Sequence, residues 1–385
     1  MNSQNYSLVS TLPSPISRVK KANGYASMLF GITVMIFVSL LTASAHAKNS
    51  ATQPAFESPT SLCERPTQKI NQEKFVLING IEQWITMKGD RCDNPVILFL
   101  HGGPANPMSP YADAIYGAWQ KDFTVVHWDQ RGGGKTFIRH PKTANEALTM
   151  ELMVQDGVAV AQYLRQVLAK DKVILMGGSW GSALGLHMVK ARADLFFAYI
   201  GTAQIVSQKE NQLASYRKTL GLARAANDSN MIKSLEEIGS PPWLSPRNFG
   251  ILRRATKVLE AKATIAAPKH WWNPAASYQM DALEAQYEAG EEYSFIQFVG
   301  YKNDGMYSKI DFPAMGFSFK TPIFLVQGEE DLVTVPEVSK VYFDQIQAPE
   351  KAYVLLAKTG HNPNQISIDA EFKLLKERVL PLMRK

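Results

Sequence analysis

One pentapeptide, GGSWG at positions 177–181, constrains this chain more than any other feature. It directly follows the apolar run 172–176 and directly precedes 182–190, a stretch with helical character. A G-x-S-x-G sequence between a strand and a helix is typical of a nucleophile elbow, a sharp turn with the serine at its apex. Glycines suit the flanking positions because side chains there would collide with the strand and the helix. Ser179 is therefore a candidate nucleophile, with an ordinary glycine-rich turn as the alternative.

The pentapeptide lies within a series of predicted strands and helices. Residues 95–100, 123–128 and 172–176 form largely apolar runs, which are typical of strands buried on both faces of a parallel sheet. An amphipathic helix is predicted over 149–170. The residues expected on its buried side are Met153, Val160, Tyr163, Leu164, Val167 and Leu168.

Further strands are predicted at both ends of this region. Residues 74–78 and 81–87 flank Asn79-Gly80, a pair that strongly favours a two-residue hairpin turn. The run 196–200 follows the helix after the pentapeptide and has the composition of another strand.

The alternation of strands and helices stops near residue 205 and resumes near 321. The intervening sequence is helical in character and rich in aromatic residues. After it come a strand at 322–326, a helix from Pro336, a strand at 352–356 and a closing helix from Ile366. A chain of 385 residues is long enough for an α/β core with an inserted helical cap. The predicted boundaries are a linker at 48–68, the first part of the core at 69–204, the cap at 205–320 and the second part of the core at 321–385.

Residues 1–47 have the character of an export signal. Three basic residues, Arg18, Lys20 and Lys21, precede an apolar stretch at 28–41, and small residues then form a cleavage-like pattern up to Ala47. The sequence therefore predicts a periplasmic or secreted protein. An uncleaved anchor, with the catalytic part outside the membrane, is the alternative. Any membrane anchoring would come through residues 28–47.

Charge and cysteine content narrow the choice of partners. The net charge is +6, and three of these positive charges lie in residues 1–47, which contain no acid, so the rest carries +3. No basic stripe with interleaved aromatics is evident, so no nucleic-acid partner is expected. The two cysteines, Cys63 and Cys92, are expected to form a disulfide in an oxidising compartment, with two free thiols as the alternative. With no third cysteine, a cysteine-based metal site is not expected.

A nucleophilic serine needs a general base, and chain order restricts the choice. In nucleophile-elbow enzymes the acid and then the histidine follow the serine. Only His187, His270 and His361 come after Ser179. His187 lies two turns along the predicted helix and His270 lies in the insertion. His361 follows the last predicted strand, where it can lean over the carboxyl edge of the sheet, so it is the predicted base.

The acid is expected just after the strand that precedes the histidine. Residues 327–331, Gln-Gly-Glu-Glu-Asp, offer three carboxylates there. Asp331 is the preferred candidate because it comes after the turn, while Glu329 and Glu330 remain alternatives. A buried carboxylate would hold the imidazole in the tautomer that accepts the serine proton.

The oxyanion that forms during acyl transfer needs hydrogen-bond donors. One is expected to be the backbone N–H of Trp180, directly after the nucleophile. The other is expected from the glycines that follow the strand 95–100, with Gly103 preferred over Gly102 because the backbone there can approach the reacting carbonyl. His101, in the same loop, is expected to be structural.

Five motifs in this order resemble those of the proline iminopeptidase family of α/β-hydrolases. They are HGGP at 101–104, WDQRG at 128–132, GGSWG at 177–181, G-x-x-D at 328–331 and GH at 360–361. The resemblance covers most of the chain beyond the signal. It implies an eight-stranded, mostly parallel sheet with flanking helices and a helical cap. It also implies a Ser179–Asp331–His361 triad, with Gly103 and Trp180 as oxyanion donors, that releases an amino-terminal residue, typically proline, from short peptides.

The chain departs from the family pattern at several places. Ala105 stands where the family usually has glycine, and GGGKT at 132–136 replaces the usual end of the WDQRG motif. The family binds the free amino group of the substrate through cap glutamates, one of them after a tryptophan, and no clear match is present. The candidates are Glu284, Glu288, Glu291 and Glu292, for which a solvated helix face is the alternative.

Together these patterns predict an exported serine hydrolase that needs neither a metal nor a cofactor. Aminopeptidase action on short peptides is the leading expectation. Carboxylesterase action on small or lipophilic esters is the alternative, because an aromatic cap would also suit an apolar acyl group. A non-catalytic binding protein with this fold would be expected to have lost a triad residue, and all three are present.

Overall fold

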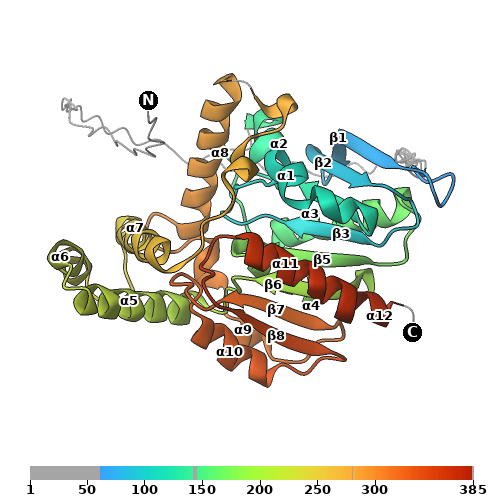
Figure 1. Ribbon diagram of the computed structural model, residues 1–385. Coiled ribbons are helices and arrows are strands. Elements are labelled where there is room, and N and C mark those ends of the chain that lie inside the picture. Colours follow the sequence, from blue (N-terminus) through green and yellow to red (C-terminus); the bar gives the residue numbers. More distant parts are fainter. Residues whose placement is uncertain (1–60, 142–144, 280, 384–385) are drawn as a thin grey trace, which may run out of the picture. The chain divides into compact units, whose positions relative to one another are not determined.

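The computed structural model describes residues 61–141, 145–279 and 281–383 (Figure 1). The chain divides into two units, 1–56 and 57–385, and all described residues belong to the second. The predicted signal or anchor at 1–47 and most of the predicted linker lie outside the described residues. Among the helices that are described, none has both the length and the apolar character needed to cross a membrane.

An eight-stranded sheet forms the centre of the described unit, in the order β1-β2-β4-β3-β5-β6-β7-β8 (Figure 1). The strands β3 to β8 run parallel to one another, while β2 pairs antiparallel with both β1 and β4. The predicted eight-stranded, mostly parallel sheet is confirmed. The strands are β1 (Ile70–Ile78), β2 (Ile81–Gly89), β3 (Val96–Leu100), β4 (Thr124–Trp128), β5 (Val173–Gly178), β6 (Phe196–Thr202), β7 (Ile323–Gly328) and β8 (Lys351–Leu356).

The hairpin between β1 and β2 has the predicted two-residue turn. Ile78 pairs with Ile81 across it. Asn79 and Gly80 have φ of 43° and 85°, the left-handed backbone that this kind of turn requires and that asparagine and glycine tolerate.

The sheet is buried between two layers of helices. Successive residues of β3 illustrate this, because Leu98 belongs to one hydrophobic cluster and Phe99 to the other, as expected when side chains alternate along a strand. One layer contains α3 (Met150–Val167), α4 (Trp180–Ala191) and α10 (Pro336–Gln345). The other contains α1 (Ala112–Tyr116), α11 (Gln365–Leu374) and α12 (Leu380–Leu382).

The helix α3 matches the predicted helix over 149–170 with shorter ends. Thr149 caps its amino terminus by accepting a hydrogen bond from the N–H of Leu152 at 3.1 Å. Of the predicted buried residues, only Tyr163 is half-buried; its ring lies 5.7 Å from Nζ of Lys74.

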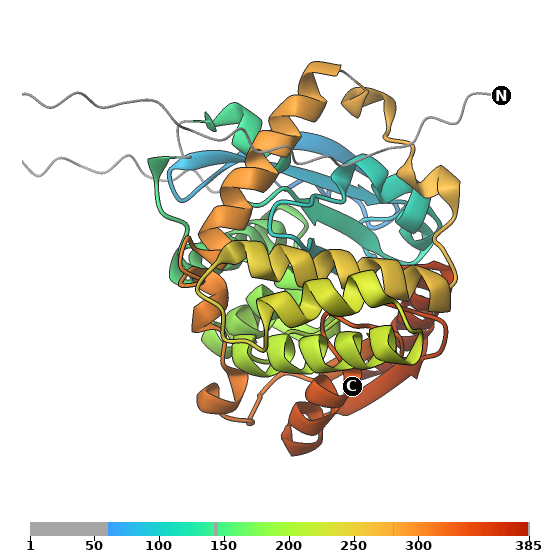
Figure 2. The ribbon, with the colours of Figure 1, turned by 90° about the vertical axis from the view of Figure 1, so that its left-hand side faces the viewer.

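The helical insertion forms two separate packing groups. The helices α5 (Gln208–Ala225), α6 (Ser229–Ile238) and α7 (Pro246–Ala263) share a small apolar cluster of their own and lie stacked in Figure 2. The helix α8 (Asp281–Val299) runs across them more steeply (Figure 2). It packs instead on α2 (Gly134–Arg139) of the core.

Contacts around α2 attach α8 to the core. The rings of Tyr293 and Phe137 stack with centroids 5.8 Å apart. Ser294 Oγ donates a hydrogen bond to the carbonyl of Gly132 at 2.8 Å. A Cβ on Gly290 would lie 3.1 Å from the Phe137 ring, so a glycine there lets the two helices approach closely. The helix α8 is therefore fixed to the core around α2.

Cys63 and Cys92 are joined in a disulfide. It ties the segment before β1 to the loop before β3. The N–H of Leu62 also donates to the carbonyl of Val167 at the end of α3, at 2.7 Å, so the start of the described chain is attached at two points.

Glu371 in α11 is a buried carboxyl group whose effect on stability can be measured. Its carboxyl is 4% exposed, and burial raises its pKa to about 8. Because the folded pKa lies above the ordinary value, its contribution to stability is complete below about pH 4.5 and is lost as pH rises through 8. We expect Glu371→Gln to remove that loss. The free energy of unfolding of the wild type should therefore fall, relative to that of the variant, by on the order of 1 kcal/mol per pH unit across this window.

The measurement is the free energy of unfolding from urea titrations between pH 5 and 9. Glu377→Gln, at an exposed position one turn and a half further along, serves as the control and should follow the wild type. Parallel pH curves for the wild type and Glu371→Gln would contradict the prediction.

Candidate active site

Ser179 lies at the sharp turn between β5 and α4. Its φ of 53° and ψ of −119° are unusual for a residue with a side chain and cost on the order of 1–3 kcal/mol. Its N–H donates to the carbonyl of Thr202 at 3.0 Å, and the N–H groups of Ser182 and Ala183 donate to its carbonyl. The turn is therefore held from both sides in the strained conformation that presents the hydroxyl.

Two glycines of the pentapeptide are required by close backbone contacts. A Cβ on Gly177 would lie 2.2 Å from the carbonyl oxygen of Gly181. A Cβ on Gly181 would lie 2.1 Å from the carbonyl oxygen of Leu100 at the end of β3. Both distances are far below van der Waals contact, so the strand, turn and helix can meet only without side chains there.

His361 connects Ser179 to Asp331 through hydrogen bonds. Its Nε2 lies 3.0 Å from Oγ of Ser179, and its Nδ1 lies 3.2 Å and 3.1 Å from Oδ1 and Oδ2 of Asp331. Asp331 follows β7 and His361 follows β8, so both residues and Ser179 come from the carboxyl ends of strands. The other two candidate histidines are not part of this arrangement; His187 packs against Phe312 with ring centroids 5.0 Å apart.

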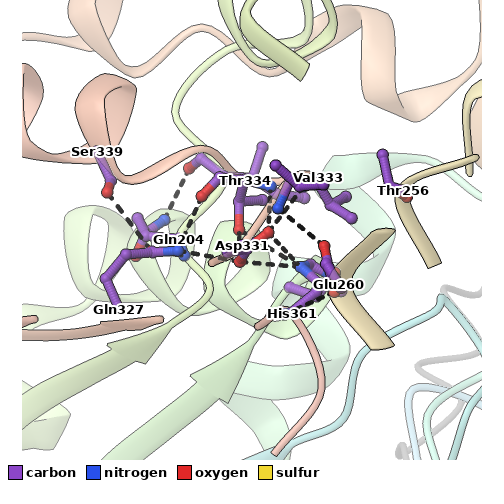
Figure 3. Close-up of polar contacts among 12 residues, drawn as sticks. Gln204, Thr256, Glu260, Gln327, Asp331, Val333, Thr334, Ser339 and His361 are labelled. Atoms are coloured by element: carbon purple, nitrogen blue, oxygen red, sulfur yellow. Dashed lines mark hydrogen bonds and ion pairs between the residues drawn. The ribbon is translucent and has the colours of Figure 1, made fainter. Parts of the chain in front are cut away.

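Asp331 is fully buried and accepts several hydrogen bonds (Figure 3). The donors are the N–H groups of Val333 and Thr334, each at 2.8 Å, Oγ1 of Thr334 at 2.6 Å and Nε2 of Gln327 at 2.9 Å. Burial alone would raise the pKa of Asp331, but the His361 imidazole and the Thr334 donors lower it below the ordinary value. The carboxylate form is therefore favoured.

Glu329 and Glu330, the alternative acids, lie in the turn between β7 and Asp331. Glu329 is exposed and Glu330 half-exposed, and only Asp331 of the three carboxylates is hydrogen-bonded to His361. Asp331, the acid preferred from its position after the turn, is thus the one that contacts His361.

The loop after β3 lies directly against the serine turn. A Cβ on Gly102 would be 3.4 Å from Cβ of Ser179, and Gly103 has a φ of 107° that favours glycine. Trp180 begins α4, so its N–H is free of the helix's own hydrogen bonds. In the part of the chain that is described, neither this N–H nor that of Gly103 has a protein acceptor. Both are therefore available to an oxygen beside Ser179.

His101 is built into this loop as a neutral side chain. Its Nε2 accepts a hydrogen bond from the N–H of Gln130 at 3.1 Å, and its Nδ1 lies 2.9 Å from the carbonyl of Gly102. Burial lowers its pKa to about 4. His101 thus positions Gly102 without carrying charge near neutral pH.

The two departures from the family motifs are neighbours in space. Ala105 has a φ of 65° and is buried. A Cβ on Gly133 would lie only 2.9 Å from Cβ of Ala105. Because Gly133 has no side chain, the methyl group of Ala105 fits beside it.

The four candidate glutamates on α8 differ in their surroundings. Glu284, Glu288 and Glu292 are exposed, whereas Glu291 is half-buried. Asn106 Nδ2, close to the glycine loop, donates to Oε1 of Glu291 at 2.7 Å. Burial raises the pKa of Glu291. Only Glu291 of these four is thus connected to the loop beside Ser179.

Glu260 in α7 is a residue that sequence reasoning missed. Its carboxylate accepts hydrogen bonds from the N–H groups of Leu332 at 2.8 Å and His361 at 3.1 Å. A signal for it exists in the sequence, because Glu260 falls in register with the buried stripe of α7. The buried residues of that helix are Leu252, Ala255, Thr256, Leu259 and Glu260.

The arrangement has the parts needed for acyl transfer through a serine. A hydroxyl, an imidazole and a buried carboxylate are hydrogen-bonded in series, beside two N–H donors. The described residues contain no group of three or more His, Cys, Asp or Glu side chains placed to hold a metal ion.

The glycine contacts generate a prediction about the serine turn. We expect the Gly177→Ala variant to yield little folded protein or to have little activity, because the new methyl would collide with the Gly181 carbonyl. Gly221→Ala is the matched control, because Gly221 is exposed within α5 and nothing lies within 4 Å of its Cβ position. The free energy of unfolding of this variant should rise by about 0.5–1 kcal/mol. Thermal unfolding of both variants tests this, and a Gly177→Ala protein as stable and active as the wild type would refute it.

Comparison with known proteins agrees with the fold and with a hydrolase. A family model described as "alpha/beta hydrolase fold" matches residues 95–237. The "Probable aminopeptidase YbaC" of Bacillus subtilis is 29% identical over 76% of this chain and 91% of its own length. The "Proline iminopeptidase" of Arabidopsis thaliana is 26% identical over 76% of this chain and 75% of its own length.

Solved structures show the same fold at lower identity. The proline iminopeptidase of Mycobacterium smegmatis superposes with a TM-score of 0.56 at 18% identity, over 81% of this chain and 97% of its own. VinJ superposes with a TM-score of 0.59, also at 18% identity, over 83% of this chain and 100% of its own. These structures share the α/β-hydrolase fold with this chain. By its similarity to the aminopeptidase and proline iminopeptidase relatives, the chain is an enzyme, an α/β-hydrolase similar to the proline iminopeptidases.

Proposed function

We propose that this protein is an exported serine aminopeptidase that releases amino-terminal residues, proline among them, from short peptides. The observation that carries the proposal is the hydrogen-bonded series Ser179–His361–Asp331 at a strained turn. The aminopeptidase and proline iminopeptidase relatives support the substrate class.

In the proposed mechanism His361 acts first as a general base. Its Nε2 takes the proton from Ser179 Oγ as that oxygen attacks the scissile carbonyl carbon. Asp331 accepts the Nδ1 proton in a hydrogen bond, which keeps Nε2 unprotonated and then stabilises the imidazolium. The lowered pKa of Asp331 suits this role because it favours the charged carboxylate that the imidazolium needs beside it.

The negative charge that develops on the carbonyl oxygen would be stabilised by the N–H groups of Gly103 and Trp180. Each such donor typically contributes about 3 kcal/mol to the transition state. Collapse of the tetrahedral intermediate breaks the C–N bond, and His361 gives its proton to the leaving amine. Water, activated by the same histidine, then attacks the acyl-enzyme and releases the amino-terminal residue.

We infer that Glu291 binds the positively charged amino group of the substrate. Its half-buried carboxylate lies next to the loop that carries Gly103, through Asn106. Within the described residues, no lysine or arginine lies in ion-pair distance of it. A charge-assisted hydrogen bond from an ammonium group would satisfy this carboxylate.

The proposed location outside the cytoplasm is supported by two features. Residues 1–47 have the pattern of an export signal, and the Cys63–Cys92 disulfide fits an oxidising compartment. An uncleaved anchor would leave the catalytic unit on the same side of the membrane.

A fluorophosphonate probe tests the nucleophile. We expect the wild type to be labelled and Ser179→Ala to give no labelling, because only an activated serine reacts. Ser234→Ala, which changes an exposed serine of α6, should still be labelled. Continued labelling of Ser179→Ala would refute the assignment.

A substrate panel separates the peptidase from the esterase. Prolyl and other aminoacyl arylamides should be hydrolysed alongside p-nitrophenyl esters, since an amide leaving group needs the general acid that His361 provides. Turnover of esters without any arylamide turnover would reject the aminopeptidase and favour the carboxylesterase.

Replacement of the proposed amine-binding carboxylate gives a further prediction. Glu291→Gln should lower kcat/KM for aminoacyl arylamides by about 10- to 100-fold, as expected for loss of a charged hydrogen bond of 1.5–3 kcal/mol. Its activity on p-nitrophenyl acetate, which has no amino group, should stay unchanged. Glu292→Gln, exposed on the same helix, should match the wild type on both substrates, and equal losses on both for Glu291→Gln would contradict the assignment.

A further inference from the structure

An arginine of the helical insertion lies on the face of α7 that meets the catalytic loops. Glu260 marks this face, because its carboxylate accepts hydrogen bonds from the N–H groups of Leu332 and His361 (Figure 3). Arg253 precedes Glu260 by two turns of the same helix, so the two side chains share that face. The side chain of Arg253 is half-buried, and the carboxylates of Glu260 and Asp331 are near enough to affect its pKa. The guanidinium therefore lies close to the catalytic series.

The charge of Arg253 is not paired within the described residues. No Asp or Glu carboxylate there lies within ion-pair distance of it, whereas the buried Arg131 pairs with Asp156 at 2.8 Å. In the same part of the chain, its side chain makes one hydrogen bond, from Nη1 to Oγ1 of Thr256 at 3.2 Å. Most of the five N–H donors of this guanidinium are therefore left without a protein acceptor.

The surroundings of Arg253 make an unpaired charge costly. Burial lowers its pKa, and the carboxylates of Glu260 and Asp331 raise it only in part. Neither carboxylate takes a hydrogen bond from the guanidinium, because both accept from backbone N–H groups instead. A cation held away from water without a partner is unfavourable, so this position suits an arginine that meets an anion from outside the chain.

Aromatic packing fixes this region relative to the nucleophile. The ring of Trp180, directly after Ser179, meets Phe298 of α8 edge-on with centroids 5.4 Å apart. Phe298 in turn stacks on Tyr307 with centroids 4.8 Å apart. Burial raises the pKa of Tyr307, and the nearby charge of Arg253 opposes that rise. The guanidinium thus lies beside a series of packed rings that begins at the serine turn.

We propose that Arg253 binds a carboxylate of the peptide substrate close to the scissile bond. The planar guanidinium forms paired, charge-assisted hydrogen bonds with carboxylates, which would supply the acceptors that the protein leaves out. Two groups of a short peptide can provide this carboxylate. One is the terminal carboxylate of the residue that leaves from a dipeptide, and the other is an acidic side chain on the amino-terminal residue. The inference rests on the proposed aminopeptidase function and narrows its substrates to peptides with a negative charge near the cleaved bond.

Matched pairs of substrates test this subsite. Prolylglycine and prolylglycinamide differ only at the terminal carboxylate, and the p-nitroanilides of glutamate and glutamine differ only at the side chain. For the wild type, we expect kcat/KM to be about 10- to 100-fold higher for the charged member of one pair, the effect of a hydrogen bond between charged groups. The pair that shows this preference identifies which carboxylate Arg253 binds.

Substitution of Arg253 should abolish the preference. In Arg253→Gln the ratio of kcat/KM between the charged and neutral members should fall close to one, because the charge is lost. Arg253→Lys keeps the charge but not the planar fork, so it should keep part of the preference. Arg254→Gln, which changes the exposed next residue of α7, is the matched control and should keep the wild-type ratio. A general loss of stability would leave the ratio unchanged, since both members are measured on the same protein.

Binding to the inactive Ser179→Ala protein gives a second measurement that needs no turnover. Calorimetric titration with the same peptides should show a Kd about 10- to 100-fold lower for the charged member. Adding Arg253→Gln to this protein should remove the difference. Thermal unfolding verifies that each variant is folded at the assay temperature. If Arg253→Gln is not folded, Arg253→Lys takes its place and should show a reduced difference.

The outcomes separate the subsite from the function on which it rests. A wild type with no preference in either pair would overturn the subsite, and so would an equal preference in the wild type and Arg253→Gln. A wild type that hydrolyses none of the peptides would reject the aminopeptidase function. The Kd values of the Ser179→Ala protein would then decide by themselves for or against a carboxylate site at Arg253.

Discussion

The site depends on a constraint of parallel sheets: strands that run the same way end at the same edge. The parallel strands β5, β7 and β8 end there with Ser179, Asp331 and His361 in the turns that follow. Residues far apart in the sequence thereby come within 3.0–3.2 Å of one another. The strained turn at Ser179 is maintained because glycines let the backbone of α4 pack against β3 and β5. Without that close packing the hydroxyl would have no fixed position relative to the imidazole.

The helical insertion meets this edge at two different places. The helix α8 is attached to the core through α2 and brings Glu291 to Asn106, beside the glycine loop. The helix α7 belongs to a separately packed group and brings Glu260 to the loops of Asp331 and His361. Glu291 and Glu260 of the insertion therefore lie in different surroundings, one beside the glycine loop and the other beside the loops of Asp331 and His361.

Much of this arrangement could be predicted from the sequence, because chain order and strand ends specify it. The hairpin at Asn79-Gly80 follows from a local pattern, and the choice of His361 over His187 follows from chain order. The eight-stranded sheet was implied by the resemblance to the family. The role of Glu260 could not be predicted from a motif, because its contacts with the loops of Asp331 and His361 arise only in the folded chain. The fit of Ala105 against Gly133 depends on two loops that meet only in the folded chain. The separation of α8 from the other inserted helices likewise depends on tertiary contacts such as Phe137 with Tyr293.

The central claim, that an activated Ser179 forms a covalent acyl-enzyme, is tested most directly by locating the acyl group. A slowly deacylating ester is mixed with the enzyme, the reaction is quenched with acid, and the modified peptide is identified by mass spectrometry. The account predicts one acyl group per chain, on Ser179, and none when His361 is replaced by alanine. An acyl group on another residue, or full turnover by the Ser179→Ala protein, would contradict it.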